Sequence, residues 1–281
     1  MKHLYKFLIL SIVLCIGLVT AAQYAHAQID TSLLFVSPER LSFPAAENNQ
    51  PVTRLIHVTN KSNKIARFDV RLEDYMMGEN GDVKRVEEFK YSARPFLRYT
   101  PKRFTLKPNE RLAVRVMFQQ PEDLADGDYH AHLLFREIPS EKKEHVSSAA
   151  ETGNKVQFEI NTIYGIGVPI VVQKGMLSSR LTLAKATLTD TVLSTVFERS
   201  GNAEALGSLS VSHVVTGQEP VNLLPPQLIR MYHEVDRIER KITLPALKDR
   251  HLFNGELVLT LTPAPESSTV ADVQEIRLPL K

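Results

Sequence analysis

The sequence predicts an all-β fold built from β-sandwiches, and three observations support this prediction. Short apolar or alternating runs recur along the chain, as in TRLIHVTN, ARFDVRLEDY and YHAHLLFREI, and a period of two is typical of strands with one buried face. Turn residues separate the runs, as at Asn80-Gly81. No long stretch shows the 3.6-residue repeat of a helix, so folds that alternate strands and helices are not expected.

Residues 1–27 are expected to be a secretory signal peptide. Two lysines precede an apolar run over residues 7–19, and Ala25-His26-Ala27 fits the small-x-small cleavage pattern. The apolar run is too short for a typical membrane span, and no later segment approaches the about 20 apolar residues that a span needs. Cleavage after Ala27 would therefore leave a secreted chain without a membrane span.

The mature chain is expected to be neutral and free of cysteine. The cleaved residues hold two lysines, no acidic residue and the single cysteine, so 32 basic and 32 acidic residues remain. A neutral chain does not favour a general nucleic-acid binder. Roughly 250 residues can supply one or two ordinary cores, and a secreted protein without disulfides depends on them.

Two units are expected in the mature chain, at 28–173 and 174–281. The polar stretch 140–154 (SEKKEHVSSAAETGN) predicts a mobile loop, and Gln173-Lys174-Gly175 is typical of a hinge. Beyond the hinge, strand-like runs such as LTLAKATL and LFNGELVLTLT resume. These runs predict a second, smaller β-sandwich.

The run from Val156 to Val172 predicts an unusually long strand. Eight of the nine alternate residues in it are hydrophobic, and the strand would span roughly 50 Å where about five or six residues are usual. Its second part, 166–172, is expected in the core, while its first part is expected to be open to a partner. Pro169 favours an edge or a bulge. Gly165 and Gly167, on the opposite face, allow close backbone approach or simply ease the twist.

Three segments resemble the first domain of PapD-like periplasmic pilus chaperones. They are FVSPERLSF, TPKRFTLKPNERLAVRV and LADGDYHAHLLFREIP, of which the FREIP end is the most specific. The signal peptide, the two β-domains and the long strand agree with this resemblance, which covers most of residues 33–174 and only weakly the second domain. It implies a periplasmic protein with two immunoglobulin-like β-sandwich domains in a boomerang arrangement.

The resemblance implies a chaperone that binds secreted pilin-like subunits by donor-strand complementation. In that family the last strand of the first domain, G1, fills the slot where a subunit lacks a strand, and the subunit then passes to an outer-membrane usher. No nucleotide or other cofactor is needed for this exchange. The donated residues are expected at the start of the long strand, at Val156, Phe158, Ile160, Thr162 and Tyr164.

Family members also hold the terminal carboxylate of the subunit with an arginine of the first strand and a lysine of G1. Arg40 stands in the place of the arginine, and its planar guanidinium suits a carboxylate. Pro169 stands in the place of the lysine, and Gln173 replaces another basic residue of G1. This departure favours an alternative, an envelope structural or adaptor protein of the same fold that does not serve an usher. A self-capping dimer also stays open.

Other features are interpreted as structural. The spacing of His130 and His132 can hold zinc, but no third ligand is near in sequence, so two partly exposed histidines and no metal site are expected. Residues 84–115 hold ten basic and three acidic residues; a solvated surface divided between faces is expected, with docking on acidic lipid or a negatively charged partner as the alternative. No catalytic motif is present, so no enzyme is expected. The lack of tryptophan disfavours a carbohydrate-binding sandwich.

Overall fold

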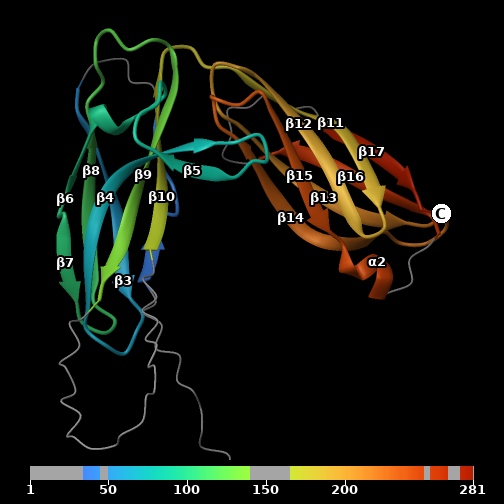
Figure 1. Cartoon of the computed structure of the whole chain (residues 1–281), viewed down its shortest axis with the longest axis horizontal. Helices are drawn as coiled ribbons and strands as arrows, with labels where there is room; N and C mark the ends of the chain where they lie inside the picture. The colour runs from blue at the N-terminus through green and yellow to red at the C-terminus, as the bar shows by residue number, and fades with distance from the viewer. Residues whose placement is uncertain (1–33, 45–49, 140–164, 250–253, 265–272, 281) are drawn as a thin grey trace, which may run out of the picture.

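The chain forms two all-β lobes set at an angle to each other (Figure 1). The computed structural model describes residues 34–44, 50–139, 165–249, 254–264 and 273–280. Within them, the helical elements are the 3-10 turn η2 (Arg94–Phe96) and the helix α2 (Pro245–Asp249). The all-β prediction is therefore confirmed. The expected signal peptide (1–27) and the polar stretch 140–154 lie outside the described residues.

The first lobe is a sandwich of two sheets. One sheet has the strand order β1 (Leu34–Ser37), β3 (Val52–Asn60), β8 (Arg111–Phe118) and β6 (Leu97–Thr100). The other has the order β2 (Leu41–Phe43), β10 (Gly165–Lys174), β9 (Gly127–Ile138), β4 (Ala66–Met77) and β5 (Val83–Val86), with β7 (Arg103–Leu106) beside β4. Because the chain changes sheets between β1 and β2, the link that contains Arg40 lies at the edge of the sandwich.

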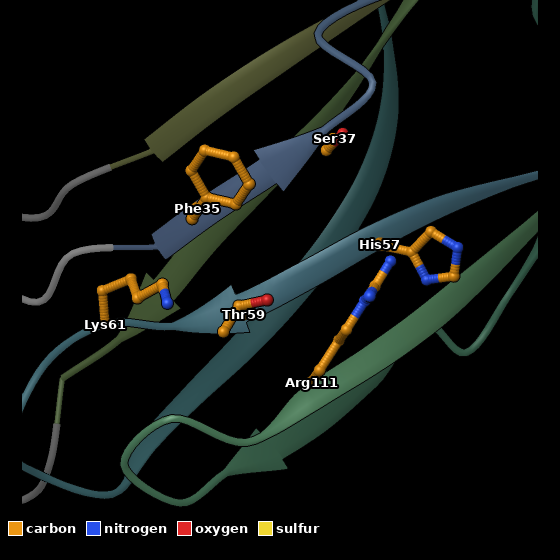
Figure 2. A pocket seen from close by; sticks show the side chains of 6 residues that line it. All are labelled: Phe35, Ser37, His57, Thr59, Lys61 and Arg111. Carbon is orange, nitrogen blue, oxygen red and sulfur yellow. The ribbon is translucent and has the colours of Figure 1, made fainter.

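The period-two pattern of the sequence decides which side chains face the core of this lobe. Alternate residues of β3 and β8, such as Ile56 and Val116, are fully buried between the sheets. Val168, Ile170 and Val172 of β10 enter the same core as expected, whereas Ile166, also expected in the core, is exposed. The intervening residues of β1, β3 and β8 point away from the sandwich (Figure 2).

The second lobe is the second sandwich that the sequence predicts. Its first sheet has the order β11 (Ser179–Thr189), β12 (Val192–Gly201) and β15 (Arg237–Thr243). Its second sheet has the order β14 (Val221–Met231), β13 (Ala205–Val214), β16 (Glu256–Pro263) and β17 (Gln274–Pro279). Phe197, Leu209 and Leu259, from three different strands, are completely buried in its core.

The two lobes are packed against each other as well as joined by the chain. Met77 and Val171 of the first lobe are buried in the core of the second. The β4–β5 hairpin reaches across to the second lobe (Figure 1), where the backbone N–H of Glu239 donates to the carbonyl oxygen of Glu79 at 2.8 Å. The second lobe therefore covers the outer face of β9 at His130 and His132 and that of β10 at Val171, whereas it does not cover the outer face of the β1–β3–β8–β6 sheet.

Candidate partner-binding site

The strand β10, which continues the predicted donor pattern, has one incomplete edge. On one side it pairs with β9 along its whole described length. On the other side, β2 pairs with it only at Ile170–Val172. In the described part of the chain, the edge of β10 from Gly165 to Pro169 thus has no neighbouring strand. Unpaired backbone groups on such an edge are available to a strand from another chain.

A groove of about 390 Å³ runs beside this open edge, between β10 and β1. Ile166 and Val168 line one side, and Leu34 and Val36 line the other. Ile166 is 36% exposed, whereas Val168 is 1% exposed, so the apolar stripe of β10 emerges from the core toward the start of the strand. The opening between the two sheets therefore lies next to the first described residues of β10.

The predicted donor residues themselves lie outside the described residues. These are Val156, Phe158, Ile160, Thr162 and Tyr164. The expected length of the strand likewise stays a prediction, since the described part begins at Gly165. Pro169 is the last residue before β2 begins to pair, which places the proline at the boundary between the open and the covered edge of β10.

The second predicted site residue, Arg40, faces the second lobe and is engaged there. Its guanidinium donates two hydrogen bonds to the carboxylate of Glu204, one of them at 2.9 Å, and another at 3.1 Å to the hydroxyl of Ser42. The side chains of Arg40 and Glu204 are only 14% and 5% exposed. They form a buried, bidentate ion pair between the lobes.

A second cation lies beside this ion pair. Arg230 of β14 places its Nε 4.0 Å from Glu204, and that nitrogen is buried with no hydrogen-bond partner among the described residues. Burial alone lowers the pKa of Arg40, but the hydrogen bonds and charge of Glu204 outweigh burial and raise it. Two guanidinium groups therefore lie beside one glutamate in the cleft.

A cavity of about 540 Å³ extends from this cleft along the outer face of β10. Gly165, Gly167 and Pro169 form part of its wall, and Arg230 and Arg240 approach from the second lobe. A Cβ at Gly167 would come no closer than 4.0 Å to any atom, so this glycine is not required for close packing within the folded chain. A cavity with two cations and a bare strand surface suits an anionic group of a bound chain.

The expectation that His130 and His132 are partly exposed is wrong. They are 1% and 9% exposed, because the second lobe covers the outer face of β9. His130 contacts the Glu234 carboxylate at 3.1 Å and stacks on Tyr232 with 4.0 Å between ring centroids. Burial, followed by the charge of His130, lowers the pKa of His132 to about 4, so His132 is neutral near pH 7. Within the described residues, no group of three or more metal-ligating side chains occurs.

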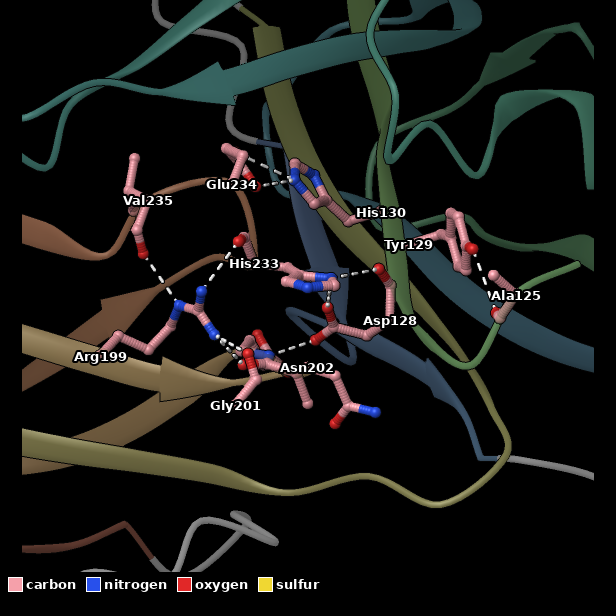
Figure 3. Close-up of polar contacts among 12 residues, drawn as sticks. Ala125, Asp128, Tyr129, His130, Arg199, Gly201, Asn202, His233, Glu234 and Val235 are labelled. Carbon is pink, nitrogen blue, oxygen red and sulfur yellow. Dashed lines mark hydrogen bonds and ion pairs between the residues drawn. The ribbon is translucent and has the colours of Figure 1, made fainter.

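A network of buried polar groups fills the junction next to these histidines (Figure 3). Asp128 of β9 accepts a hydrogen bond from the backbone N–H of Glu204 and lies 3.4 Å from the ring of His233. The pKa of Asp128 is raised to about 7, mainly by burial. The hydrogen bond from the backbone N–H of Glu204 lowers this pKa, and the negative charge of the Glu204 carboxylate raises it. The pKa of Glu234 is lowered from its ordinary value. Burial alone would raise this pKa, but the hydrogen bond to His130 and the charge of His130 outweigh burial.

Arg199 of β12 organises the second-lobe side of this network. Its guanidinium donates to the carbonyl oxygens of Gly201, Ala203, His233 and Val235, so a side chain only 3% exposed fastens the loops that carry His233 and Glu234. The sequence does not single out Glu204 or Arg199, because they lie in no motif, and it does not show that Asp128 and Glu204 become neighbours when the lobes dock.

Comparisons with known proteins found similar solved structures but no sequence match. No family model matches the chain, and no curated protein sequence matches it. The E. coli chaperone DraB is similar with 12% identity and a TM-score of 0.40, covering 88% of this chain and 98% of its own. The Pseudomonas aeruginosa CupB2 chaperone is similar with 11% identity and a TM-score of 0.41, covering 88% and 100%.

A structure of the Salmonella enterica SafA pilin in complex with the SafB chaperone is similar with 10% identity and a TM-score of 0.42, covering 89% of this chain and 97% of its own. Among the described residues, no helix has the length and apolar character needed to span a membrane.

Proposed function

We propose that the protein is a periplasmic chaperone of the PapD-like type that binds secreted pilin-like subunits by strand addition. The observation that carries this proposal is the open edge of β10 at Gly165–Pro169, beside a groove between the two sheets. A partner strand that pairs there would satisfy exposed backbone groups and extend the sheet, which is how strand addition gives affinity. Delivery of the subunit to an outer-membrane usher belongs to the same proposal.

Donor residues on the even-numbered positions would continue the stripe that the structure describes. Val168 and Ile170 fill the core of the chaperone itself, while Ile166 lies at the mouth of the groove. Preceding even-numbered residues, such as Ile160 and Tyr164, would then insert into the subunit, since alternate side chains share one face of a strand. On this proposal, one strand would contribute side chains both to the core of the chaperone and to the core of the subunit.

The anchor for the subunit's terminal carboxylate would lie in the interdomain cleft. Arg40 is proposed to contribute to it, although a bound carboxylate would have to compete with Glu204. Arg230 and Arg240 line the cavity that Pro169 also lines. These arginines of the second lobe would supply the positive charge that a lysine at position 169 would otherwise provide.

The decisive experiment compares two substitutions in the predicted donor segment. Ile160→Asp places a charge in the even-numbered stripe and is expected to abolish co-purification with secreted subunits from the periplasm. Ile163→Asp, on the other face of the same segment, introduces the same charge and is expected to retain most of the binding. Equal binding by both variants, or no copurifying subunit with the wild-type protein, would refute strand donation.

A second candidate is an envelope adaptor of the same fold that does not serve an usher. It is favoured by the pairing of Arg40 with Glu204, because the predicted carboxylate anchor is already satisfied within the chain. For an adaptor, replacing both residues with methionine should leave partner binding unchanged. For a chaperone that uses Arg40, the same double variant should weaken binding of a subunit much more than it weakens the fold.

A further inference from the structure

The outer face of the β1–β3–β8–β6 sheet carries no acidic residue. Its outward positions are every second residue of each strand, beginning with Phe35 in β1, Thr53 in β3, Arg98 in β6 and Arg111 in β8. None of these residues is Asp or Glu. The second lobe packs on the opposite sheet of the sandwich, so this face, here called the basic face, is left open.

Three cations of the basic face lie without an acidic partner in the part of the chain that the structure describes. Arg111 lies opposite Thr59, and Arg115 lies opposite Leu55. Lys61 joins Arg111 in lining a shallow hollow of about 310 Å³ (Figure 2). Among the described residues, none of these three cations forms an ion pair.

Arginines elsewhere in the first lobe behave differently. Arg71 and Arg103 pair with Asp69, and Arg94 pairs with Asp74. Of the arginines in residues 84–115, Arg94 and Arg103 thus form ion pairs, whereas Arg111 and Arg115 of β8 form none with the described residues. Glu110, adjacent to Arg111, accepts a hydrogen bond from the backbone N–H of Lys107, so its carboxylate is directed at that turn.

Large apolar side chains are exposed on the same face. Phe35 is 55% exposed and Leu55 is 43% exposed. Phe35 lies opposite Thr59, which in turn lies opposite Arg111, so one row across three strands carries an aromatic ring at one end and a cation at the other. Cations combined with aromatic and aliphatic groups suit the interface between lipid headgroups and acyl chains.

We propose that the basic face docks on an anionic lipid bilayer, with the cations near lipid phosphates and Phe35 and Leu55 at the headgroup boundary. A lipid surface is favoured over an acidic protein because the face combines charges of one sign with the exposed apolar side chains of Phe35 and Leu55. Cations of one sign attract an anionic lipid surface, and apolar side chains beside them suit the boundary between headgroups and acyl chains. This docking does not use β10, which belongs to the other sheet, although Phe35 also borders the groove beside β10.

The test is co-sedimentation of the full-length mature protein with lipid vesicles. Binding is expected to vesicles that contain phosphatidylglycerol, to be absent from pure phosphatidylcholine vesicles, and to fall as salt is raised. Arg111→Gln with Arg115→Gln should weaken binding about 30-fold, since each cation near an anionic membrane contributes about 1 kcal/mol. Phe35→Ser should weaken it without changing the charge.

The matched control removes two cations from the second lobe, Lys185→Gln with Lys241→Gln, at exposed positions. This variant should bind as the wild-type protein does. Equal losses in the two double variants would overturn the proposal, because net charge and not the basic face would then decide binding. Failure to bind anionic vesicles, with binding of poly-glutamate that depends on Arg111 and Arg115, would also overturn it in favour of an acidic polypeptide partner.

Discussion

Replacing Asp128 with asparagine should remove a pH dependence that the buried carboxyl imposes on stability. Asp128 is 2% exposed, and its pKa in the folded protein is about 7 instead of the ordinary 3.8. The folded state therefore holds this proton more tightly than the unfolded chain does. The contribution of the protonated Asp128 carboxyl to the stability of the fold is fully present below about pH 4 and is lost as the pH rises to about 7.

The size of the effect follows from the shift in the pKa of Asp128. A shift of about three pKa units corresponds to about 4 kcal/mol over the whole window, and between about pH 5 and pH 8 the loss is about 2.5 kcal/mol. Asparagine keeps an acceptor for the backbone N–H of Glu204 but does not titrate. The Asp128→Asn variant should thus gain about 2.5 kcal/mol relative to wild type over this pH interval.

The assay is urea denaturation of both proteins at the two pH values, supported by an NMR titration of the carboxyl carbon of Asp128. The control is Asp123→Asn, at an exposed position, for which the difference from wild type should be nearly constant with pH. A constant difference for Asp128→Asn, or an NMR midpoint near 4, would refute the argument that burial between the lobes raises this pKa.

Two further substitutions test the junction of the lobes by other means. Gly201→Ala should destabilise the protein by at least about 2 kcal/mol, because its φ is +103° and a Cβ would lie 2.1 Å from the carbonyl oxygen of Ser178. Gly217→Ala, at φ +79° with no atom within 4 Å, should cost only about 1 kcal/mol, and similar losses of unfolding free energy would contradict the packing argument. Glu204→Ala should cost about 3–5 kcal/mol by leaving Arg40 buried and unpaired, and replacing both with methionine should recover much of this loss. If thermal denaturation gives the double methionine variant a melting temperature equal to or below that of Glu204→Ala, the expected recovery of stability is contradicted.

The strands that alternate strictly in the sequence are the ones that could be predicted from it. The run YHAHLLFREI lies in β9, and the stripe of β10 enters the core as expected. The strand-like runs predicted from the sequence do not include β14, which contains Pro225 and Pro226, residues that disfavour a central strand. In the structure β14 is the edge strand of its sheet and has irregular register with β13, and an edge tolerates prolines that a central strand does not.

The candidate site was only partly predictable, for a physical reason. A period of two shows which face of a strand is buried, but it does not show whether the other face meets water or a second lobe. For this reason His130 and His132 were expected to be partly exposed, although the second lobe covers them. Asp128 and Glu204 are likewise ordinary acidic residues in sequence, separated by 76 positions, and only docking brings them together.

In the proposed carboxylate anchor, Glu204 is a greater obstacle to a bound carboxylate than Pro169 is. Pro169 does not leave the cleft without positive charge, because Arg230 and Arg240 reach the same cavity from the second lobe. Glu204, in contrast, already occupies the fork of Arg40. An incoming carboxylate would either displace Glu204, at the cost of a buried ion pair, or bind beside it through Arg230, whose Nε has no hydrogen-bond partner among the described residues. The second route leaves the junction of the lobes intact, so an anchor in this protein should depend more on Arg230 than on Arg40.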